Sequence, residues 1–388
     1  MAYAAVVERH KTREVGVGDM IVGGSNPIWV QSMTTTNTFD VAATVEQIRR
    51  LEEAGCEVAR VTVPKKEDVE ALGAIRSQIR IPLIADIHFD YRMALGALDA
   101  KTPDGRRAVD KIRINPGNIG GEERFKEVVR KARDLGVPMR IGVNSGSLEK
   151  DLIEKYGFPC PEALVESALR HIETAESLGY HDMIISVKSS HVPTAVDTYT
   201  KFAAASDYPT HVGITEAGSR EYGTLKSAAG IGAILLRGIG DTIRVSLLGD
   251  PVPEIAAAFD ILRATDRRVN RPEVVACPTC GRLDIDLERI VAEVEAKMAH
   301  LKNPIRVSIL GCLVNGFGEA KEADLGIAAG SGKGIIFKKG IPIRHVQEAE
   351  MVEALLEEVA RFDEETPPLK SHADKERSRK QGLTVINV

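Results

Sequence analysis

Short apolar runs alternate with helical patterns along most of the chain. An apolar run at residues 27–33 is followed by a helical periodicity at residues 41–54, with Asp40 placed to cap that helix. Further apolar runs lie at residues 57–63, 82–87, 111–114, 138–143, 182–187, 209–214 and 241–247. The helical patterns between them include residues 122–134, 161–178, 193–204, 224–237 and 253–263. Strands that alternate with amphipathic helices predict a parallel sheet.

About eight such units within about 240 residues favour an α/β fold of the TIM type, a (β/α)8 barrel, over residues 1–264. A doubly wound open sheet is the alternative, but no Gly-x-Gly-x-x-Gly sequence follows the first strand. Residues 12–24, before that strand, alternate between apolar and polar positions and contain several glycines. This pattern is typical of a hairpin, which we expect to cover the bottom of the barrel.

The pattern changes after Arg263. Residues 265–272 are polar and predict a linker. Residues 273–364 predict a small α+β domain, with helices at 286–300 and 346–362 and strands at 305–310, 325–329 and 334–338. The glycine-rich segment 330–334 lacks the spacing of a phosphate-binding loop and predicts a hairpin turn. Residues 365–388 form a charged tail, which we expect to be loosely ordered.

Composition narrows the class of protein. Apolar residues make up 43% of the chain and the formal net charge is -5, so no overall basic field favours nucleic acid. No apolar run approaches the roughly 20 residues that span a bilayer, and the start of the chain is too short for a signal peptide core. We therefore expect a cytoplasmic protein with no membrane partner. Disulfides are disfavoured in that compartment.

Three of the five cysteines lie in two short segments near the C-terminal end. Cys277 and Cys280 are spaced as Cys-x-x-Cys, and Cys312 follows after a predicted helix and strand. Thiolates favour zinc or an iron–sulfur cluster, and a closed zinc site needs a fourth ligand that no further Cys-x-x-Cys supplies. An iron–sulfur cluster with Glu319 as the nearest further ligand is therefore favoured, and structural zinc is the alternative. Cys56 and Cys160 have no such neighbours, and we predict that they are structural.

Polar and charged residues recur where the predicted barrel strands end. Since active sites of TIM barrels lie at that end, these residues should meet at one mouth. They are Arg60 and Thr62, Asp86 and His88, Arg113 and Asn115, Arg140 and Asn144, Lys188, Thr215 and Glu216, and Arg244 and Ser246. Arginines and a lysine in otherwise apolar strands indicate an anionic ligand, because forked guanidinium groups suit phosphate oxygens. The alternative for any single arginine is an ion pair with Asp86 or Glu216.

Taken together, these motifs resemble the bacterial hydroxymethylbutenyl diphosphate synthase family of the methylerythritol phosphate pathway of isoprenoid synthesis. The similar segments are residues 30–34, 86–88, 113–118, 140–144, 277–281 and 311–320, and the resemblance covers nearly the whole chain. Phe317 stands where the family usually has proline. The resemblance therefore still implies the ligand positions of that loop, but it does not predict the backbone conformation of the loop.

The resemblance implies an oxidoreductase. Its reaction is the two-electron reductive ring opening of 2-C-methyl-D-erythritol 2,4-cyclodiphosphate, with loss of water, to 4-hydroxy-3-methylbut-2-enyl diphosphate. By the same resemblance, Cys277, Cys280 and Cys312 hold a 4Fe-4S cluster and Glu319 is the ligand of its fourth iron. Flavodoxin or ferredoxin is the implied electron donor. The family also implies a homodimer in which the barrel mouth of one subunit closes against the cluster domain of the other.

The resemblance further assigns roles at the barrel mouth. Substrate-binding roles fall on Arg60, Arg113, Arg140, Asn144, Lys188, Thr215, Arg244, Ser246 and Asn315. Glu216 and His88 are candidates for proton handling. The alternative function is a phosphate-ester or pterin synthase barrel whose C-terminal zinc or cluster module is structural.

Overall fold

The computed structural model describes residues 7–269, 271–283, 285–301, 303–312 and 323–365. The chain divides into two compact units, residues 1–268 and residues 269–388. No helix in the described part of the chain is both long and apolar enough to cross a bilayer.

The first unit is the predicted TIM-type barrel. Over the described residues, an eight-stranded parallel sheet runs in the order β8-β7-β6-β5-β4-β3-β10-β9, and a bridge between Ile185 and Thr210 joins its two ends. The strands are β3 (Trp29–Met33), β4 (Val58–Thr62), β5 (Leu83–Ile87), β6 (Lys111–Ile114), β7 (Met139–Asn144), β8 (Met183–Lys188), β9 (His211–Val212) and β10 (Thr242–Ile243). The last two are shorter than the apolar runs that predict them.

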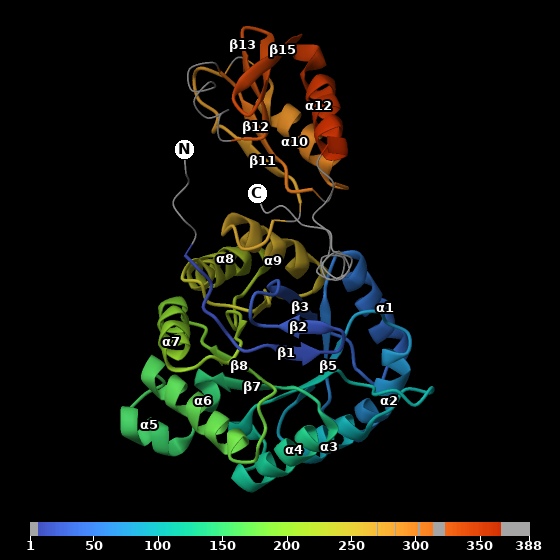
Figure 1. Cartoon of the computed structure of the whole chain (residues 1–388), viewed down its shortest axis with the longest axis vertical. Coiled ribbons are helices and arrows are strands. Elements are labelled where there is room, and N and C mark those ends of the chain that lie inside the picture. Colours follow the sequence, from blue (N-terminus) through green and yellow to red (C-terminus); the bar gives the residue numbers. More distant parts are fainter. Residues whose placement is uncertain (1–6, 270, 284, 302, 313–322, 366–388) are drawn as a thin grey trace, which may run out of the picture. The chain divides into compact units, whose positions relative to one another are not determined.

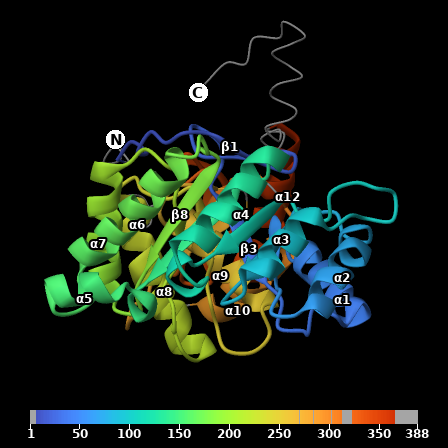
Figure 2. The same ribbon diagram turned by 90° about the horizontal axis from the view of Figure 1, so that it is seen from below.

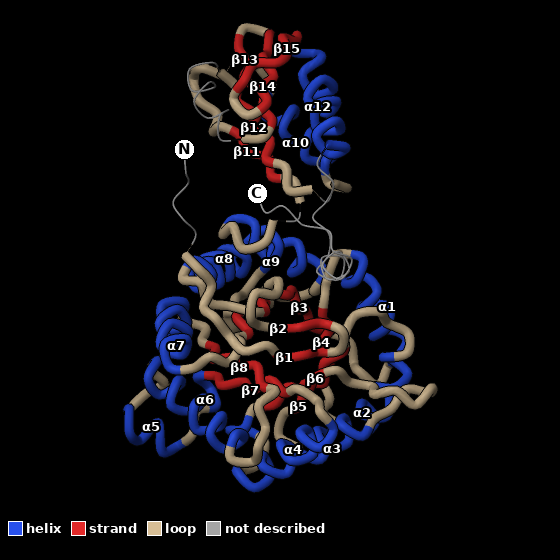
Figure 3. Tube along the Cα trace, in the orientation of Figure 1, coloured by secondary structure: helices blue, strands red, loops and turns tan. Residues whose placement is uncertain are grey.

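Helices surround these strands (Figures 1 and 3). They are α1 (Val41–Glu53), α2 (Lys66–Arg76), α3 (Tyr91–Asp99), α4 (Glu122–Leu135), α5 (Lys150–Tyr156), α6 (Pro161–Glu176), α7 (Val192–Ala205), α8 (Arg220–Leu236) and α9 (Val252–Ala264). Seen from below, α1 and α2 lie on one side of the strands and α5 and α7 on the other (Figure 2). The predicted cap holds, because the side chain of Asp40 accepts a hydrogen bond from the backbone N–H of Ala43 (3.1 Å).

Alternate residues of each barrel strand face opposite sides. Apolar residues such as Val61, Ala85 and Ile141 belong to the large core that includes the helices. The other positions face the barrel interior, and several of those near the bottom are also apolar. There, Val58, Ile84 and Ile184 pack against the N-terminal hairpin.

The hairpin consists of β1 (Val15–Val17) and β2 (Met20–Val22), which pair antiparallel. Val15, Val17 and Val22 pack with Ile184, and Met20 packs with Val58 and Ile84. Those partners lie near the starts of their strands, so the hairpin covers the bottom of the barrel, as the sequence predicts. The opposite end remains for a ligand.

The second unit contains a mixed sheet, five-stranded over the residues described, in the order β11-β12-β13-β14-β15. Its elements are β11 (Glu273–Ala276), α10 (Leu287–Met298), β12 (Arg306–Leu310), β13 (Leu325–Gly330), β14 (Lys333–Lys338), β15 (Ile341–Gln347) and α12 (Met351–Glu365). The core joins α10 and α12 to residues of β12, β13 and β14. The predicted α+β domain is confirmed.

Two features of this unit differ from or refine the prediction. The last helix does not begin at Val346, because residues 341–347 pair with β14 and extend the sheet as β15. The turn predicted at residues 330–334 is confirmed: Gly330 pairs with Lys333, and the two residues between them, Ser331 and Gly332, have φ of 53° and 70°. Positive φ at both positions is typical of the tight turn that suits the twist of a hairpin.

The first residues of the predicted linker are held by the barrel. The guanidinium of Arg268 donates to the carbonyl of Ile28 (3.0 Å) and pairs with Glu57 (2.6 Å). It also lies over the rings of Trp29 and Phe259. Residues 265–268 therefore belong with the first unit. The other domain limits stay predictions.

Candidate functional site at the barrel mouth

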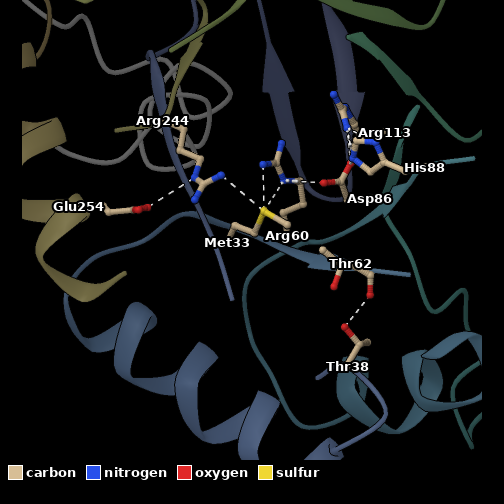
Figure 4. A network of polar contacts seen from close by, with 9 residues as sticks. All are labelled: Met33, Thr38, Arg60, Thr62, Asp86, His88, Arg113, Arg244 and Glu254. Atoms are coloured by element: carbon tan, nitrogen blue, oxygen red, sulfur yellow. Dashed lines mark hydrogen bonds and ion pairs between the residues drawn. The ribbon is translucent and has the colours of Figure 1, made fainter. Parts of the chain in front are cut away.

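Cationic side chains gather inside the barrel. Four of those in the described chain are only 2–6% exposed: Arg60 on β4, Arg113 on β6, Arg140 on β7 and Lys188 on β8. Arg113 and Arg140 are direct neighbours in the sheet register. Arg244, which follows β10, is partly buried beside them, and Figure 4 shows Arg60 between Arg244 and Arg113. The structure thus brings together all five predicted cations.

Asp86 at the end of β5 is the acid that faces them. Its carboxylate lies 2.9 Å from Nη1 of Arg113, 3.6 Å from Nε of Arg60 and 3.5 Å from Nε2 of His88. Burial raises the pKa of Asp86, but the charges of Arg60 and Arg113 and the His88 contact outweigh burial and hold it well below its ordinary value. Ion pairing with Asp86, the alternative for a single arginine, therefore holds for Arg60 and Arg113.

These ion pairs leave several N–H donors of the buried cations without acceptors. Arg140 Nε and Nη1, Arg60 Nη1 and Arg113 Nε are buried, and none has a hydrogen-bond partner among the described atoms. Lys188 has no side-chain hydrogen bond or ion pair with any described residue. Burial lowers the pKa of Lys188 well below its ordinary value, and Arg140 and Arg60 lower it further. Buried donors without acceptors are costly, so the site is suited to an anion.

Arg244 has its own acid. Its Nε lies 3.4 Å from Glu254 on α9, a carboxylate that also accepts from Ser32 Oγ (2.9 Å) and from the backbone N–H of Leu247 (2.9 Å). Glu254 is 2% exposed. Glu254 was not predicted as a site residue, because an acid in the first turn of a helix is usually exposed to solvent.

Lys111 was also missed, although the signal is present in the sequence. The strand reads Lys-Ile-Arg-Ile, so Lys111 and Arg113 face the same side, and Lys111 is 1% exposed. Burial lowers the pKa of Lys111 well below its ordinary value, and the charges of Arg140 and Arg60 lower it further. The barrel interior therefore contains more cationic side chains than sequence analysis assigned to it.

Glycines leave room for two of these cations. A Cβ atom at Gly142 on β7 would lie 2.9 Å from both Nε and Nη2 of Arg113. At Gly213, after β9, it would lie 3.0 Å from Nζ of Lys188 and 2.8 Å from the carbonyl oxygen of Arg244. The missing side chains let Arg113 and Lys188 cross the faces of neighbouring strands.

The remaining predicted residues of the mouth surround this cluster less closely. Asn144, Thr215 and Ser246 follow or end their strands and are partly buried. His88 is 36% exposed and contacts Nη1 of Arg113. Glu216 is exposed, has φ of 52° and makes no side-chain ion pair with a described residue, so it is not a partner of the buried arginines.

The cysteine segments lie at one edge of the sheet in the second unit. β11 and β12 are parallel neighbours, and Cys277 and Cys312 follow their carboxyl ends. The backbone N–H of Gly311 donates to Sγ of Cys277 (3.2 Å), which brings the two segments together. Cys280 is exposed. Within the described residues no group of three His, Cys, Asp or Glu is close enough to hold a metal ion, and Asn315, Phe317 and Glu319 lie outside them.

Cys56 and Cys160 are buried in the barrel core, as the structural prediction requires. Sγ of Cys56 donates to the carbonyl of Val58 (3.3 Å), and burial raises the pKa of this thiol to about 12. A thiol with so high a pKa is a poor metal ligand.

Comparison with known families accounts for both units. Residues 12–259 match the GcpE TIM-barrel domain, and residues 273–361 match the GcpE protein C-terminal domain. The chain belongs to the GcpE family. A GcpE relative from Geobacillus kaustophilus (strain HTA426) is 53% identical over 360 residues, which cover 93% of this chain and 94% of the relative. Its name is 4-hydroxy-3-methylbut-2-en-1-yl diphosphate synthase (flavodoxin).

A relative of the same name from Caldanaerobacter subterraneus subsp. tengcongensis is 52% identical and covers 92% of this chain and 99% of its own length. Among solved structures, dihydropteroate synthase from Stenotrophomonas maltophilia is 15% identical with a TM-score of 0.47, and covers 65% of this GcpE chain and 97% of its own. The curated relatives support the family predicted from the motifs.

We expect Gly142→Ala to weaken anion binding without unfolding the barrel. The atoms that a Cβ would meet belong to the end of the flexible Arg113 side chain, so the guanidinium moves and the backbone does not. Losing one well-placed contact from a charged donor should raise the Kd for inorganic diphosphate about 10-fold by isothermal titration calorimetry. Gly16→Ala, where a Cβ meets nothing within 4 Å, is the control. An unchanged Kd in Gly142→Ala would show that Arg113 does not need this space.

We expect Lys111→Met to stabilise the free protein at neutral pH. The pKa of Lys111 is lower in the folded chain than the roughly 10.4 of an unfolded lysine, so the unfolded state binds more protons between the two values. Stability therefore rises with pH across that window and is lowest below it. The variant removes this dependence, and its melting temperature at pH 7 should rise by about 2–4 °C for each kcal/mol recovered. Melting curves at pH 7 and 9 test this, with exposed Lys150→Met as the control. If Lys111→Met has a lower melting temperature and the same dependence on pH as the wild type, the lowered pKa of Lys111 is not the cause.

Proposed function

We propose that this GcpE-family chain catalyses the reductive ring opening of 2-C-methyl-D-erythritol 2,4-cyclodiphosphate to 4-hydroxy-3-methylbut-2-enyl diphosphate. Two electrons and a proton enter, a ring C–O bond to phosphate breaks, and one hydroxyl leaves as water. The curated relatives are named for this activity, and this chain matches them over nearly their whole length. A phosphate-ester or pterin synthase is not favoured.

One observation carries the proposal for the barrel. Arg60, Arg113, Arg140 and Lys188 are buried together, and Asp86 pairs with only two of them, Arg60 and Arg113. Their unpartnered N–H groups match the acceptor oxygens of a diphosphate, which supplies negative charge as well as several acceptors. The diphosphate group would therefore bind inside the mouth, where it relieves both repulsion and lost hydrogen bonds.

The residues around the cations would orient the rest of the substrate. Asn144, Thr215 and Ser246 offer neutral donors and acceptors at the ends of their strands, and Asn315 completes the proposed binding set. His88 stands between solvent and the Asp86–Arg113 pair, so it is placed to pass a proton to a leaving hydroxyl. Glu216, exposed at the same end of the barrel, is the second candidate for that transfer.

The donor set of the second unit fits a 4Fe-4S cluster. Cys277 and Cys312 follow adjacent parallel strands, and the Gly311 contact holds their segments together. Free thiols do not attract one another, so they need not converge until a cation is bound. Cys277, Cys280 and Cys312 would hold the cluster and Glu319 its fourth iron. When bound, the cluster would supply the two electrons one at a time.

The names of the relatives favour flavodoxin as the electron donor, with ferredoxin as the alternative. We further propose a homodimer in which a barrel mouth and a cluster domain from different subunits form each active site. This assembly follows from the family resemblance of the motifs.

Metal content tests the cofactor. Protein prepared without oxygen should be brown and contain about four irons and four acid-labile sulfides per chain. Cys280→Ser should lose most of this iron, whereas Cys160→Ser, which changes a buried core thiol, should keep it. A colourless protein with one zinc per chain would instead indicate a structural metal site.

Turnover of the cyclodiphosphate tests the anion site. Arg140→Met removes a buried guanidinium with unpartnered donors, so we expect KM to rise about 10- to 100-fold while iron and sulfide contents stay normal. Arg130→Met, on the exposed face of α4, is the matched control. If Arg140→Met loses the cluster along with activity, Arg140 supports the structure and does not bind the substrate.

A further inference from the structure

Met33 lies between two of the arginines in the site. Its Sδ accepts hydrogen bonds from Arg60 Nη2 (3.0 Å) and Nε (3.3 Å) and from Arg244 Nη1 (3.4 Å). Figure 4 shows the sulfur at the centre of these contacts, with Arg60 on one side and Arg244 on the other. Met33 ends β3, Arg60 lies on β4 and Arg244 follows β10, and β4 and β10 are the two strands that pair with β3.

Each of these guanidinium groups is held from two directions. Nε of Arg60 lies 3.6 Å from Asp86, and Nε of Arg244 lies 3.4 Å from Glu254. The acids hold the outer sides of the pair, and the methionine sulfur lies between the two cations. Two like charges are thus kept side by side with a single neutral acceptor between them.

The chemistry of the acceptor matters for an anion site. A thioether accepts weakly and carries no charge, so it can orient a guanidinium without neutralising it. A carboxylate at this place would bind both arginines more tightly and would compete with an incoming anion. An aliphatic side chain of the same size would leave their N–H groups without an acceptor.

Methionine usually fills gaps in an apolar core, but that role does not account for the contacts of Met33. Met33 is only partly buried and lies on the interior side of β3, outside the apolar core clusters. Its neighbours through the sulfur are cations and not apolar side chains. The sulfur of Met33 therefore acts as a hydrogen-bond acceptor at this position.

We propose that Met33 is a positioning residue of the substrate site, whose thioether aligns Arg60 and Arg244 for the diphosphate while leaving their charges free. This inference rests on the proposed function, because it takes the cyclic diphosphate as the ligand. It assigns Met33 no contact with the reacting atoms.

Three substitutions separate the acceptor from its shape and charge. Met33→Leu removes the acceptor, Met33→Gln keeps a neutral acceptor on a side chain of similar length, and Met33→Glu adds a charge. We expect Met33→Leu to raise KM for the cyclodiphosphate about 3- to 10-fold with kcat changed less than about 2-fold. Met33→Gln should remain close to wild type, and Met33→Glu should raise KM by about 100-fold or more.

Met183→Leu is the matched control, because Met183 is fully buried on β8 in the apolar core. Iron content and melting temperature are measured for every variant, and Kd for the cyclodiphosphate is measured by calorimetry. If Met33→Leu matches wild type in KM and Kd, or if Met33→Leu and Met33→Gln are equally impaired, the proposal is wrong. A variant that does not fold is left out of the comparison. The KM and Kd of Met33→Leu, compared with those of Met183→Leu, then decide the outcome.

Failure of the proposed function gives a different result. In that case the wild-type protein, loaded with its metal, neither binds nor turns over the cyclodiphosphate, and both proposals fall together. Wild-type turnover with unchanged Met33→Leu kinetics overturns only the role of Met33.

Discussion

The barrel interior has to hold like charges close together and away from water. Asp86, which pairs with Arg60 and Arg113, and Glu254, which pairs with Arg244, offset part of that repulsion. No acid among the described residues pairs with Arg140, Lys111 or Lys188, and burial with neighbouring cations lowers the pKa of each of them. Several local features of the barrel are related to this constraint. The glycines at 142 and 213 give the long side chains room, and the apolar hairpin covers the bottom of the barrel.

Most of the barrel could be predicted because each signal is local. Strand and helix periods mark the units, and an arginine at the end of an apolar strand points to the mouth. Lys111 could have been found in the same way, since its strand places it two residues before Arg113 on the same face. Met33 and Gly142 could not. Their roles depend on contacts with Arg60, Arg244 and Arg113 from other strands, which no local pattern records.

The second unit was harder to predict for two physical reasons. β15 contains Pro342 and is exposed along most of its length, so its strand pattern is weak, and Val346 was assigned to the following helix. The cysteines present another difficulty. Spacing predicts a shared ligand, but neutral thiols supply no attraction of their own, and the geometry of such a site depends on the ion that they bind. The two units also have separate apolar cores, so packing in one carries no information about ligands in the other.

The hairpin at the bottom of the barrel has a kinetic consequence. In the described part of the chain, β1 and β2 pack on the starts of the strands, so the proposed ligand would enter and leave past the residues of the mouth. Substrate and product then share one route, and a product that keeps its diphosphate must leave before the next substrate enters. Retention by the cations that favour entry would slow that exit. A higher affinity for the diphosphate would therefore lower the rate of product release.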